Sequence, residues 1–325
     1  MVVRMKIVVF LQKNYFMKHI IIVIYLGCLL CSITYSQSNT FDKNEEIFNS
    51  YIQNINNETS LDSLFIKTAL YYVNTPYDYS SCNMSEVKIL ENVNETYYPS
   101  GYVSRDESEK LIVNLQEMDC VTFIENCLAL YLAVLSDSTS FDMFKQQLQK
   151  IRYRNGIING YTSRLHYTLD WIYDNTSKGI ILDKTQQMGG NKLSIKLNYM
   201  SNHNQYYEHL INHPTDIQKI KKIEKEISYR SCYYYIPKEF VSSKQLYIKT
   251  GDIICFTTSI EGLDVSHMGI AYWENDKILT FIHASKSHEK GKVIVNQQSI
   301  HDYCISRKSI TGIIVLRLHD SCTNN

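Results

Sequence analysis

Apolar residues recur at helical spacing in two stretches of the chain. In the first, residues 41–75, the side chains of Ile47, Tyr51 and Ile55 follow one another at intervals of four residues. The second stretch begins at Asp119 and has the apolar positions Ile124, Cys127, Leu128, Tyr131, Val134 and Leu135. This spacing is typical of one face of an α-helix. We therefore predict helices over 41–75 and from Asp119 onward, separated by a polar, turn-rich segment.

The C-terminal quarter of the chain alternates short apolar runs with polar turns. The runs cover residues 251–256, 265–273, 278–285, 293–296 and 312–318. Runs of this length predict strands, and turns this short join antiparallel neighbours. The preceding region, about 141–240, mixes helix-like and irregular segments. Helices followed by a meander of strands predict the α+β class.

An uncharged apolar stretch near the N-terminus decides the expected compartment. Residues 20–35 carry no charge, Lys13 and Lys18 precede them, and a polar segment follows Ser36. A secretory signal has this order of regions, and the run is shorter than the ~20 residues that a spanning helix needs. We predict a signal peptide over 1–36 and an exported protein, periplasmic or extracellular, with no stable membrane insertion after cleavage.

Two cysteines within that stretch keep a second possibility open. Cys28 and Cys31 each follow a leucine-containing pair and are candidate lipid-attachment sites. Lipidation would convert a secreted protein into an anchored one. An uncleaved membrane anchor is the other alternative at this end of the chain.

The rest of the chain shows no Gly-, Ser- or Pro-rich linker and no internal repeat. We expect an N-terminal helical region over 37–104 and a main domain over 105–320, with an insertion at about 141–240.

Composition narrows the functional classes. The chain has 33 basic and 33 acidic residues, so no overall basic field exists to hold a phosphate backbone, and no nucleic-acid partner is expected. Seven of the nine cysteines lie after residue 36. Because seven is odd, at least one thiol of the exported protein is unpaired or pairs outside the chain.

Cys120 has the position expected of a nucleophile. Asp119 is a good N-cap residue, which places Cys120 in the first turn of the predicted helix. Free N–H groups and the positive end of the helix dipole favour a thiolate there, and the Cys120 N–H could help to hold an oxyanion. A buried structural cysteine is the alternative interpretation.

Two histidines on a predicted hairpin are the candidate partners of this thiol. His267 and His283 are separated by 16 residues, an even number, so they can share one face of an antiparallel pair. We predict that a three-residue loop at 275–277 places them directly opposite each other. His267 would then exchange a proton with Cys120, while His283 orients its ring. Gly269 is expected to leave that face open to substrate.

Several segments resemble a known family. They are 115–126, 163–167, 189–190, 235–238, 251–254 and 262–271. The chain is similar to bacterial cell-wall cysteine amidases of the NlpC type, a papain-like clan. Within that clan it resembles the N-acetylmuramoyl-L-alanine amidase-like proteins, formerly called a domain of unknown function. The resemblance implies a papain-like core in which the helix with the nucleophile packs on an antiparallel sheet.

The resemblance also implies an activity and a substrate. It implies hydrolysis of the amide between the lactyl group of N-acetylmuramic acid and L-alanine, in peptidoglycan or muropeptide fragments, without a cofactor. Cys120 matches the nucleophile of the clan, His267 its base and His283 the more variable orienting position. The residues expected to contact substrate carboxylates or sugar are Arg164, His166, Tyr167 and Trp171.

Other readings remain open at this point. The same three residues could serve a stem-peptide endopeptidase that cuts next to D-glutamate, or the chain could be a non-catalytic cell-wall binding module. A lipid acyltransferase of related fold is a further alternative. His203, His209 and His213 form a local cluster, but they lack the H-E-x-x-H spacing of a zinc amidase, so no metal site is predicted.

Overall fold

The computed structural model describes residues 43–55, 61–79, 109–286 and 291–319. The chain divides into two units, Met1–Ser50 and Tyr51–Asn325. The described residues of the first unit, 43–50, are helical. The predicted signal peptide, its cleavage site and its two cysteines lie outside the described residues. Among the helices that are described, none is long and apolar enough to cross a bilayer.

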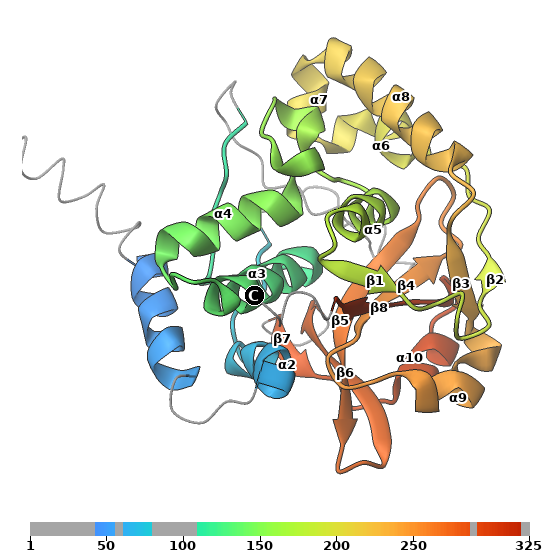
Figure 1. The fold of residues 1–325 in the computed structure, drawn as a ribbon. Helices are drawn as coiled ribbons and strands as arrows, with labels where there is room; N and C mark the ends of the chain where they lie inside the picture. The colour runs from blue at the N-terminus through green and yellow to red at the C-terminus, as the bar shows by residue number, and fades with distance from the viewer. Residues whose placement is uncertain (1–42, 56–60, 80–108, 287–290, 320–325) are drawn as a thin grey trace, which may run out of the picture. The chain divides into compact units, whose positions relative to one another are not determined.

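An antiparallel sheet forms the centre of the second unit (Figure 1). Five of its strands are β4 (Ile253–Thr258), β5 (Val265–Glu274), β6 (Ile278–Ser285), β7 (Lys292–Val295) and β8 (Ile310–Leu318). They lie in the order β8-β4-β5-β6-β7, so the last strand pairs with the first of the meander. Each corresponds to one of the five apolar runs. The structure thus confirms the predicted α+β class with an antiparallel sheet.

Three short strands from the middle of the chain extend the same sheet. β1 (Ile181–Asp183) and β3 (Tyr234–Pro237) both pair with β8, and β2 (Asn191–Lys192) pairs with β3. They contain two to four residues, too few to produce an alternating pattern in the sequence. Part of the region expected as an insertion at about 141–240 therefore contributes strands to the sheet.

Helices cover the sheet and connect its strands. Their bounds are α2 (Leu61–Tyr71), α3 (Cys120–Leu135), α4 (Phe141–Arg152), α5 (Thr168–Ser177), α6 (Tyr199–Asn202), α7 (Glu208–Asn212), α8 (Pro214–Tyr229), α9 (Val241–Lys244) and α10 (Ile300–Ser306). Single-turn 3-10 helices cover Arg154–Gly156, Tyr161–Ser163, Asn204–Tyr206, Lys238–Phe240 and Gln245–Tyr247. The sequence pattern predicted α2 and α3 but not α10.

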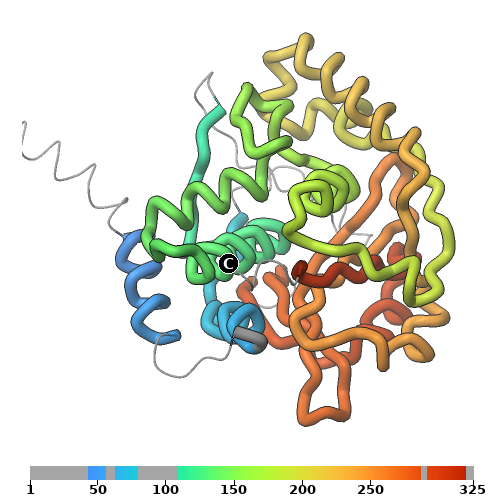
Figure 2. Tube along the Cα trace, viewed as in Figure 1, coloured from blue at the N-terminus to red at the C-terminus, as the bar shows by residue number. Residues whose placement is uncertain are grey.

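Helix α3 contacts both strands of the β5–β6 hairpin. It packs on β5 and β6 and is flanked by α2 and α4, as the tube in Figure 2 shows. Most of its side chains are buried, including Phe123, Ile124 and Leu128. A helix that is apolar on most sides belongs in the interior of a domain. Its burial fixes the position of its first residue relative to β5.

A carboxylate from the β4–β5 connection caps helix α5. Tyr167, the N-cap residue of α5, makes no side-chain cap hydrogen bond. Instead Asp264 accepts the Leu169 N–H at 2.7 Å and the Val265 N–H at 2.8 Å. Asp264 is 1% exposed, and burial raises its pKa to about 6. The start of α5 is therefore tied to the start of β5 through a single buried side chain.

This raised pKa predicts a pH-dependent stability. Because the folded-state pKa of Asp264 lies above its value in the unfolded chain, the contribution is present below about pH 4 and is lost as pH rises through 6. Replacing Asp264 by Asn removes the titration. The free-energy advantage of wild type over Asp264→Asn should fall by roughly 3 kcal/mol between pH 4 and pH 7. Urea unfolding at both pH values measures it, and a constant difference would contradict the assignment.

Candidate active site

Cys120 is the first residue of helix α3, and the N-terminus of this helix is capped by reciprocal hydrogen bonds. The Asp119 carboxylate accepts the N–H groups of Val121 and Thr122 at 3.0 and 2.7 Å, and the Thr122 hydroxyl accepts the Asp119 N–H at 2.9 Å. This reciprocal pair is a capping box. The structure confirms Asp119 as the N-cap residue. The Cys120 side chain lies at the helix start and is 8% exposed.

The environment of Cys120 favours the protonated thiol. Burial and, to a smaller extent, the neighbouring Asp119 carboxylate raise the pKa of Cys120 to about 12. Hydrogen bonding to the Met268 backbone and the charge of Lys286 act in the opposite direction but are weaker. The expected thiolate is therefore not the resting form in this structure, because the dipole of the helix does not offset desolvation. The sulfur needs a base to become a nucleophile.

The β5–β6 hairpin has the predicted loop but not the predicted register. Residues 275–277 connect Glu274 to Ile278, which pair directly. In an antiparallel pair the numbers of opposed residues have a constant sum, and this register offsets His267 and His283 by two residues. The prediction that they stand directly opposite each other is wrong. They are diagonal neighbours on one face of the sheet, as their even separation predicted.

The two imidazoles are nevertheless joined. His267 Nε2 lies 2.6 Å from His283 Nδ1, and the rings are perpendicular with centroids 4.7 Å apart. His283 is 3% exposed. This hydrogen bond uses Nε2 of His267 and leaves its Nδ1 for another partner. The two histidines that the sequence predicted to share one face are thus in contact, although by a different geometry.

Gly269 lets the two strands approach closely enough for this contact. A Cβ atom at Gly269 would lie 2.6 Å from the Phe281 ring, 2.9 Å from the Ile282 carbonyl oxygen and 3.3 Å from the His283 Cβ. The space is therefore filled by β6, and the expectation that Gly269 opens this face to substrate is wrong. The glycine serves the close approach of strands instead.

His267 is suited to accept a proton. Burial and, to a smaller extent, the charge of Lys286 lower its pKa to about 4, so the ring is neutral near pH 7. Met268, the next residue, hydrogen-bonds through its backbone to the Cys120 side chain. Among the described residues no hydrogen bond joins the thiol to His267 itself. In unliganded enzymes such contacts are often long and tighten only when substrate binds.

Tyr303 on α10 packs beneath both histidines. Its ring centroid lies 6.1 Å from that of His267 and 6.0 Å from that of His283. Burial and the nearby Cys120 raise the pKa of Tyr303, so the phenol keeps its proton. The part of the chain that the structure describes gives its hydroxyl no hydrogen-bond partner. Sequence reasoning missed Tyr303 because α10 was not predicted.

A segment from the N-terminal part of the second unit also reaches this region. The Tyr77 N–H donates to the Gly291 carbonyl at 2.8 Å, and the Asp78 N–H donates to the Met118 carbonyl at 3.1 Å. Residues 77 and 78 therefore lie between β7 and the residue that precedes Asp119. No spacing in the sequence indicates this neighbour, since more than 40 residues separate Tyr77 from Cys120.

The expected substrate-contacting residues separate into two groups. Arg164 and His166 lie before α5 and are 5% and 8% exposed. The next residue, Leu165, donates its N–H to the Arg152 carbonyl at 3.0 Å, and Arg152 donates to Glu125 of α3 at 2.7 Å, so Arg164 lies beside α3. His166 hydrogen-bonds through Nε2 to the Tyr161 carbonyl at 2.9 Å, and burial lowers its pKa to about 3, so it is neutral.

The second group lies deeper in the protein. The Tyr167 hydroxyl donates to Glu224 of α8 at 2.7 Å and accepts the Met200 N–H at 3.0 Å. Trp171 is 2% exposed within α5, and the described residues offer its indole N–H no acceptor. Both residues join α5 to its surroundings, and their contact with substrate stays a prediction.

The histidine cluster in the middle of the chain stacks rather than converges. His209 Nε2 lies 2.8 Å from Asp216, and the His209 and His213 rings are parallel with centroids 4.1 Å apart. The His203 Nδ1 instead faces the Tyr199 carbonyl. Within the described ranges, no three ligating side chains are arranged around one point.

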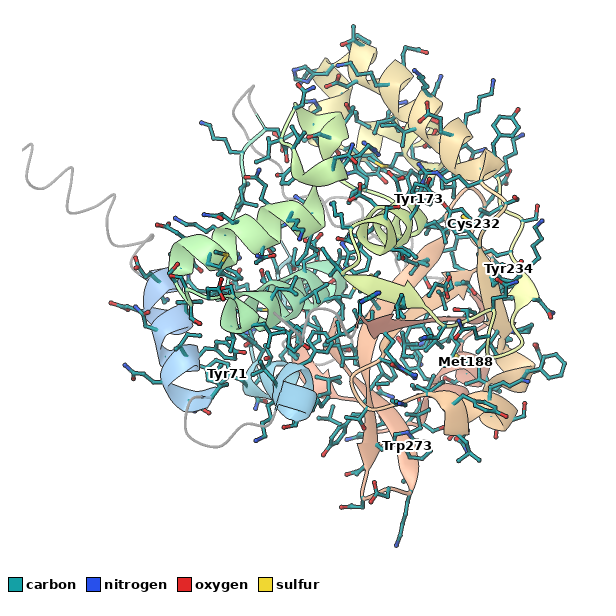
Figure 3. All side chains as sticks on the ribbon, viewed as in Figure 1. Tyr71, Tyr173, Met188, Cys232, Tyr234 and Trp273 are labelled. Carbon is teal, nitrogen blue, oxygen red and sulfur yellow. The ribbon has the colours of Figure 1, made fainter. Side chains whose placement is uncertain are left out.

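The five cysteines in the described ranges are all free thiols. Cys127, Cys255 and Cys304 are buried, and Cys232 is exposed. Figure 3 labels Cys232 near Tyr234, on the β3 side of the sheet. Cys82 and Cys322 lie outside the described residues.

The raised thiol pKa predicts how Cys120 reacts with iodoacetamide. Because the thiolate fraction rises tenfold per pH unit below the pKa, the alkylation rate of Cys120 should rise about tenfold per unit from pH 6 to pH 9. Peptide-level mass spectrometry separates this signal from that of the exposed Cys232. A rate that is already constant near pH 6 would indicate a thiolate–imidazolium pair and contradict the prediction.

The close approach at Gly269 predicts the effect of one methyl group. Gly269→Ala should destabilise the fold by about 1–3 kcal/mol, because the Cβ atom overlaps Phe281 and Ile282. It should also separate His267 from His283. Urea unfolding measures the first effect and histidine ring NMR the second. Unchanged stability together with unchanged ring signals would contradict the prediction and show that β6 moves to accommodate the methyl group without cost.

Comparison with solved structures gives close matches to this chain. An N-acetylmuramoyl-L-alanine amidase from Bacteroides uniformis matches with a TM-score of 0.67 and 36% identity, over 78% of this chain and 97% of that one. A Bacteroides fragilis protein, whose name proposes a xylanase, matches with a TM-score of 0.65 and 38% identity, over 78% and 99%. A Legionella pneumophila protein shares the fold, with a TM-score of 0.57, 21% identity and coverage of 87% and 95%.

No curated protein sequence matches the chain. The family model AmiA-like, described as N-acetylmuramoyl-L-alanine amidase-like, matches residues 90–313. That range holds every residue of the site built above except the segment at Tyr77 and Asp78. The chain therefore belongs to the AmiA-like, N-acetylmuramoyl-L-alanine amidase-like family.

Proposed function

We propose that this protein is an exported cysteine amidase that hydrolyses the bond between the lactyl group of N-acetylmuramic acid and L-alanine in peptidoglycan. Membership of the AmiA-like family and the amidase from Bacteroides uniformis support a peptidoglycan amidase. One observation carries the cysteine mechanism. Cys120, at a capped helix start, is hydrogen-bonded to the backbone beside His267, which is itself hydrogen-bonded to His283.

The first half of the reaction forms a thioester. His267, neutral because its pKa is lowered, takes the proton of Cys120 as the sulfur attacks the lactyl carbonyl carbon. The Cys120 N–H, free at the helix start, donates to the oxyanion that results. When the intermediate collapses, the C–N bond breaks and His267 returns the proton to the amine of L-alanine. The sugar stays on the sulfur as an acyl-enzyme.

The second half releases the sugar. His267 takes a proton from water, whose oxygen attacks the thioester carbonyl, and then returns the proton to the sulfur of Cys120. The products are a muramic acid carboxylate and a peptide that begins with L-alanine. Throughout both halves, His283 holds His267 in one orientation through the 2.6 Å contact between their rings. We include in the proposal a papain-like core of the NlpC type, with α3 as the helix of the nucleophile.

A xylanase activity, which the name of the Bacteroides fragilis protein suggests, has less support in this site. Retaining and inverting glycosidases generally use two carboxyl groups that flank the glycosidic bond. Two carboxylates of the α3 region are engaged in other contacts. Asp119 caps α3, and Glu125 accepts a hydrogen bond from Arg152 at 2.7 Å. An amide substrate suits the thiol and two imidazoles better.

Product analysis tests the function. The protein from Gln37 onward is incubated with defined muropeptides, and the products are identified by mass spectrometry. We expect an intact peptide beginning with L-alanine and the free sugar. Cys120→Ala should lower the rate at least about 10³-fold, and treatment with EDTA should leave it unchanged.

Matched variants make the result specific. Cys232→Ser removes an exposed thiol on the β3 side of the sheet and should retain full activity. Shortened peptides, in place of the intact one, would identify an endopeptidase instead. Cleavage that survives Cys120→Ala would remove the thiol from its role, and binding without cleavage by wild type would favour a cell-wall binding module.

A further inference from the structure

The guanidinium of Arg164 is buried, and the described residues offer it no partner. Arg164 is 5% exposed, yet within the described part of the chain its side chain makes no hydrogen bond and no ion pair. A buried cation is normally paired, because an isolated charge is costly to remove from water. The positive charge of Arg164 therefore lacks a counter-charge among the described residues. The backbone of Arg164 is fixed by a bridge to Tyr153 and by donation of its N–H to the Tyr161 carbonyl, so the side chain starts from a rigid position.

The acids near Arg164 keep it charged but do not bind it. Their negative charges raise the pKa of Arg164, so the guanidinium retains all of its N–H donors. Each of these acids is hydrogen-bonded to another group. Glu125 accepts from Arg152 at 2.7 Å, Glu109 accepts from the Tyr153 hydroxyl at 2.7 Å, and Asp119 accepts from the first turn of α3. No acid that acts on Arg164 within the described ranges is left to bind it, and a ligand can supply the counter-charge.

The location of Arg164 relates it to the proposed reaction. The segment of Arg164 is joined through Arg152 to Glu125 of α3, the helix whose first residue is Cys120. Burial raises the pKa of Asp119, the residue before Cys120, and the charge of Arg164 acts against that rise. His166, two residues after Arg164, is held neutral partly by the charge of Arg164 and offers no competing cation. A group bound to Arg164 would therefore lie close to the bond that Cys120 attacks.

We propose that Arg164 binds a carboxylate of the substrate, namely the α-carboxylate of the D-glutamyl residue that follows L-alanine, and that the enzyme therefore selects stem peptides in which this group is not amidated. This inference rests on the proposed amidase function. The acyl side of the scissile bond is an uncharged sugar, so the counter-charge comes from the peptide side. The α-carboxylate is the first anion on that side. Its two oxygens match the planar fork of a guanidinium.

Two substrates that differ in one group test this. N-acetylmuramoyl-L-alanyl-D-glutamate and N-acetylmuramoyl-L-alanyl-D-isoglutamine share the scissile bond and differ only in a carboxylate or a carboxamide at the α position. Wild type should hydrolyse the first with a kcat/KM about 10- to 100-fold higher. In Arg164→Met the preference should fall to near one, through loss of activity on the carboxylate substrate. Arg164→Lys should keep part of the preference, since it retains the charge without the fork.

The ratio of two substrates within one variant does not depend on how much of the protein is folded. Arg154→Met is the matched control, because Arg154 is partly exposed and pairs with Asp170. It should keep the wild-type preference. Binding of the same two compounds to Cys120→Ala, measured by calorimetry, should show the same order without turnover.

The outcomes separate the two proposals. If wild type hydrolyses neither compound, the proposed function fails, and this inference fails with it. Equal rates on both compounds would overturn the inference and leave the amidase function intact. A preference that persists in Arg164→Met would assign carboxylate recognition to another residue and overturn the role of Arg164.

Discussion

Burial of the first turn of α3 is the constraint on which the rest of the site depends. A helix start has N–H groups without helical partners, and an interior position leaves them no water. The capping box of Asp119 and Thr122 satisfies the N–H groups of Asp119, Val121 and Thr122, and no other described residue offers the Cys120 N–H an acceptor. The same burial desolvates Cys120 and raises its pKa to about 12. The position that orients the sulfur toward β5 thus also deprives it of its charge.

The neutral state of the neighbouring groups follows from that constraint. A thiol with a raised pKa reacts only if a base removes its proton during attack, and an imidazolium cannot do so. Burial keeps His267 neutral with a pKa of about 4. Its orientation depends on His283, which reaches it only because Gly269 has no side chain to hold the strands apart. In the proposed mechanism, three separate features of the fold would therefore serve a single proton transfer.

The local parts of the site were predictable from the sequence, and the non-local parts were not. The position of Cys120 at a helix start follows from a short stretch of sequence, namely an N-cap residue followed by an apolar helical repeat. The even separation of His267 and His283 is enough to predict that they share one face of the hairpin. Whether two residues pair directly also depends on the register, in which the numbers of paired residues have a constant sum. The predicted direct pairing was wrong because the numbers of these two histidines do not have that sum. Tyr303, Lys286 and the segment at Tyr77 enter through long-range packing. Short strands such as β3 form because β8 offers them a paired edge, which no local pattern reveals.

The segment that contains Arg164 is held by contacts to the β4–β5 connection and to α8, and this explains how a buried charge can persist without a partner among the described residues. At one end, Asp264 ties the start of α5 to β5. Between Arg164 and that point, the Tyr167 hydroxyl donates a hydrogen bond to Glu224 of α8. A guanidinium on a flexible loop would turn toward water or toward the nearest carboxylate, whereas here both the loop and the carboxylates are already committed to other contacts. Burying the cation without a counter-charge is unfavourable, and the stability of the surrounding fold offsets this cost. A carboxylate bound to Arg164 would remove the cost at the place where the substrate is positioned.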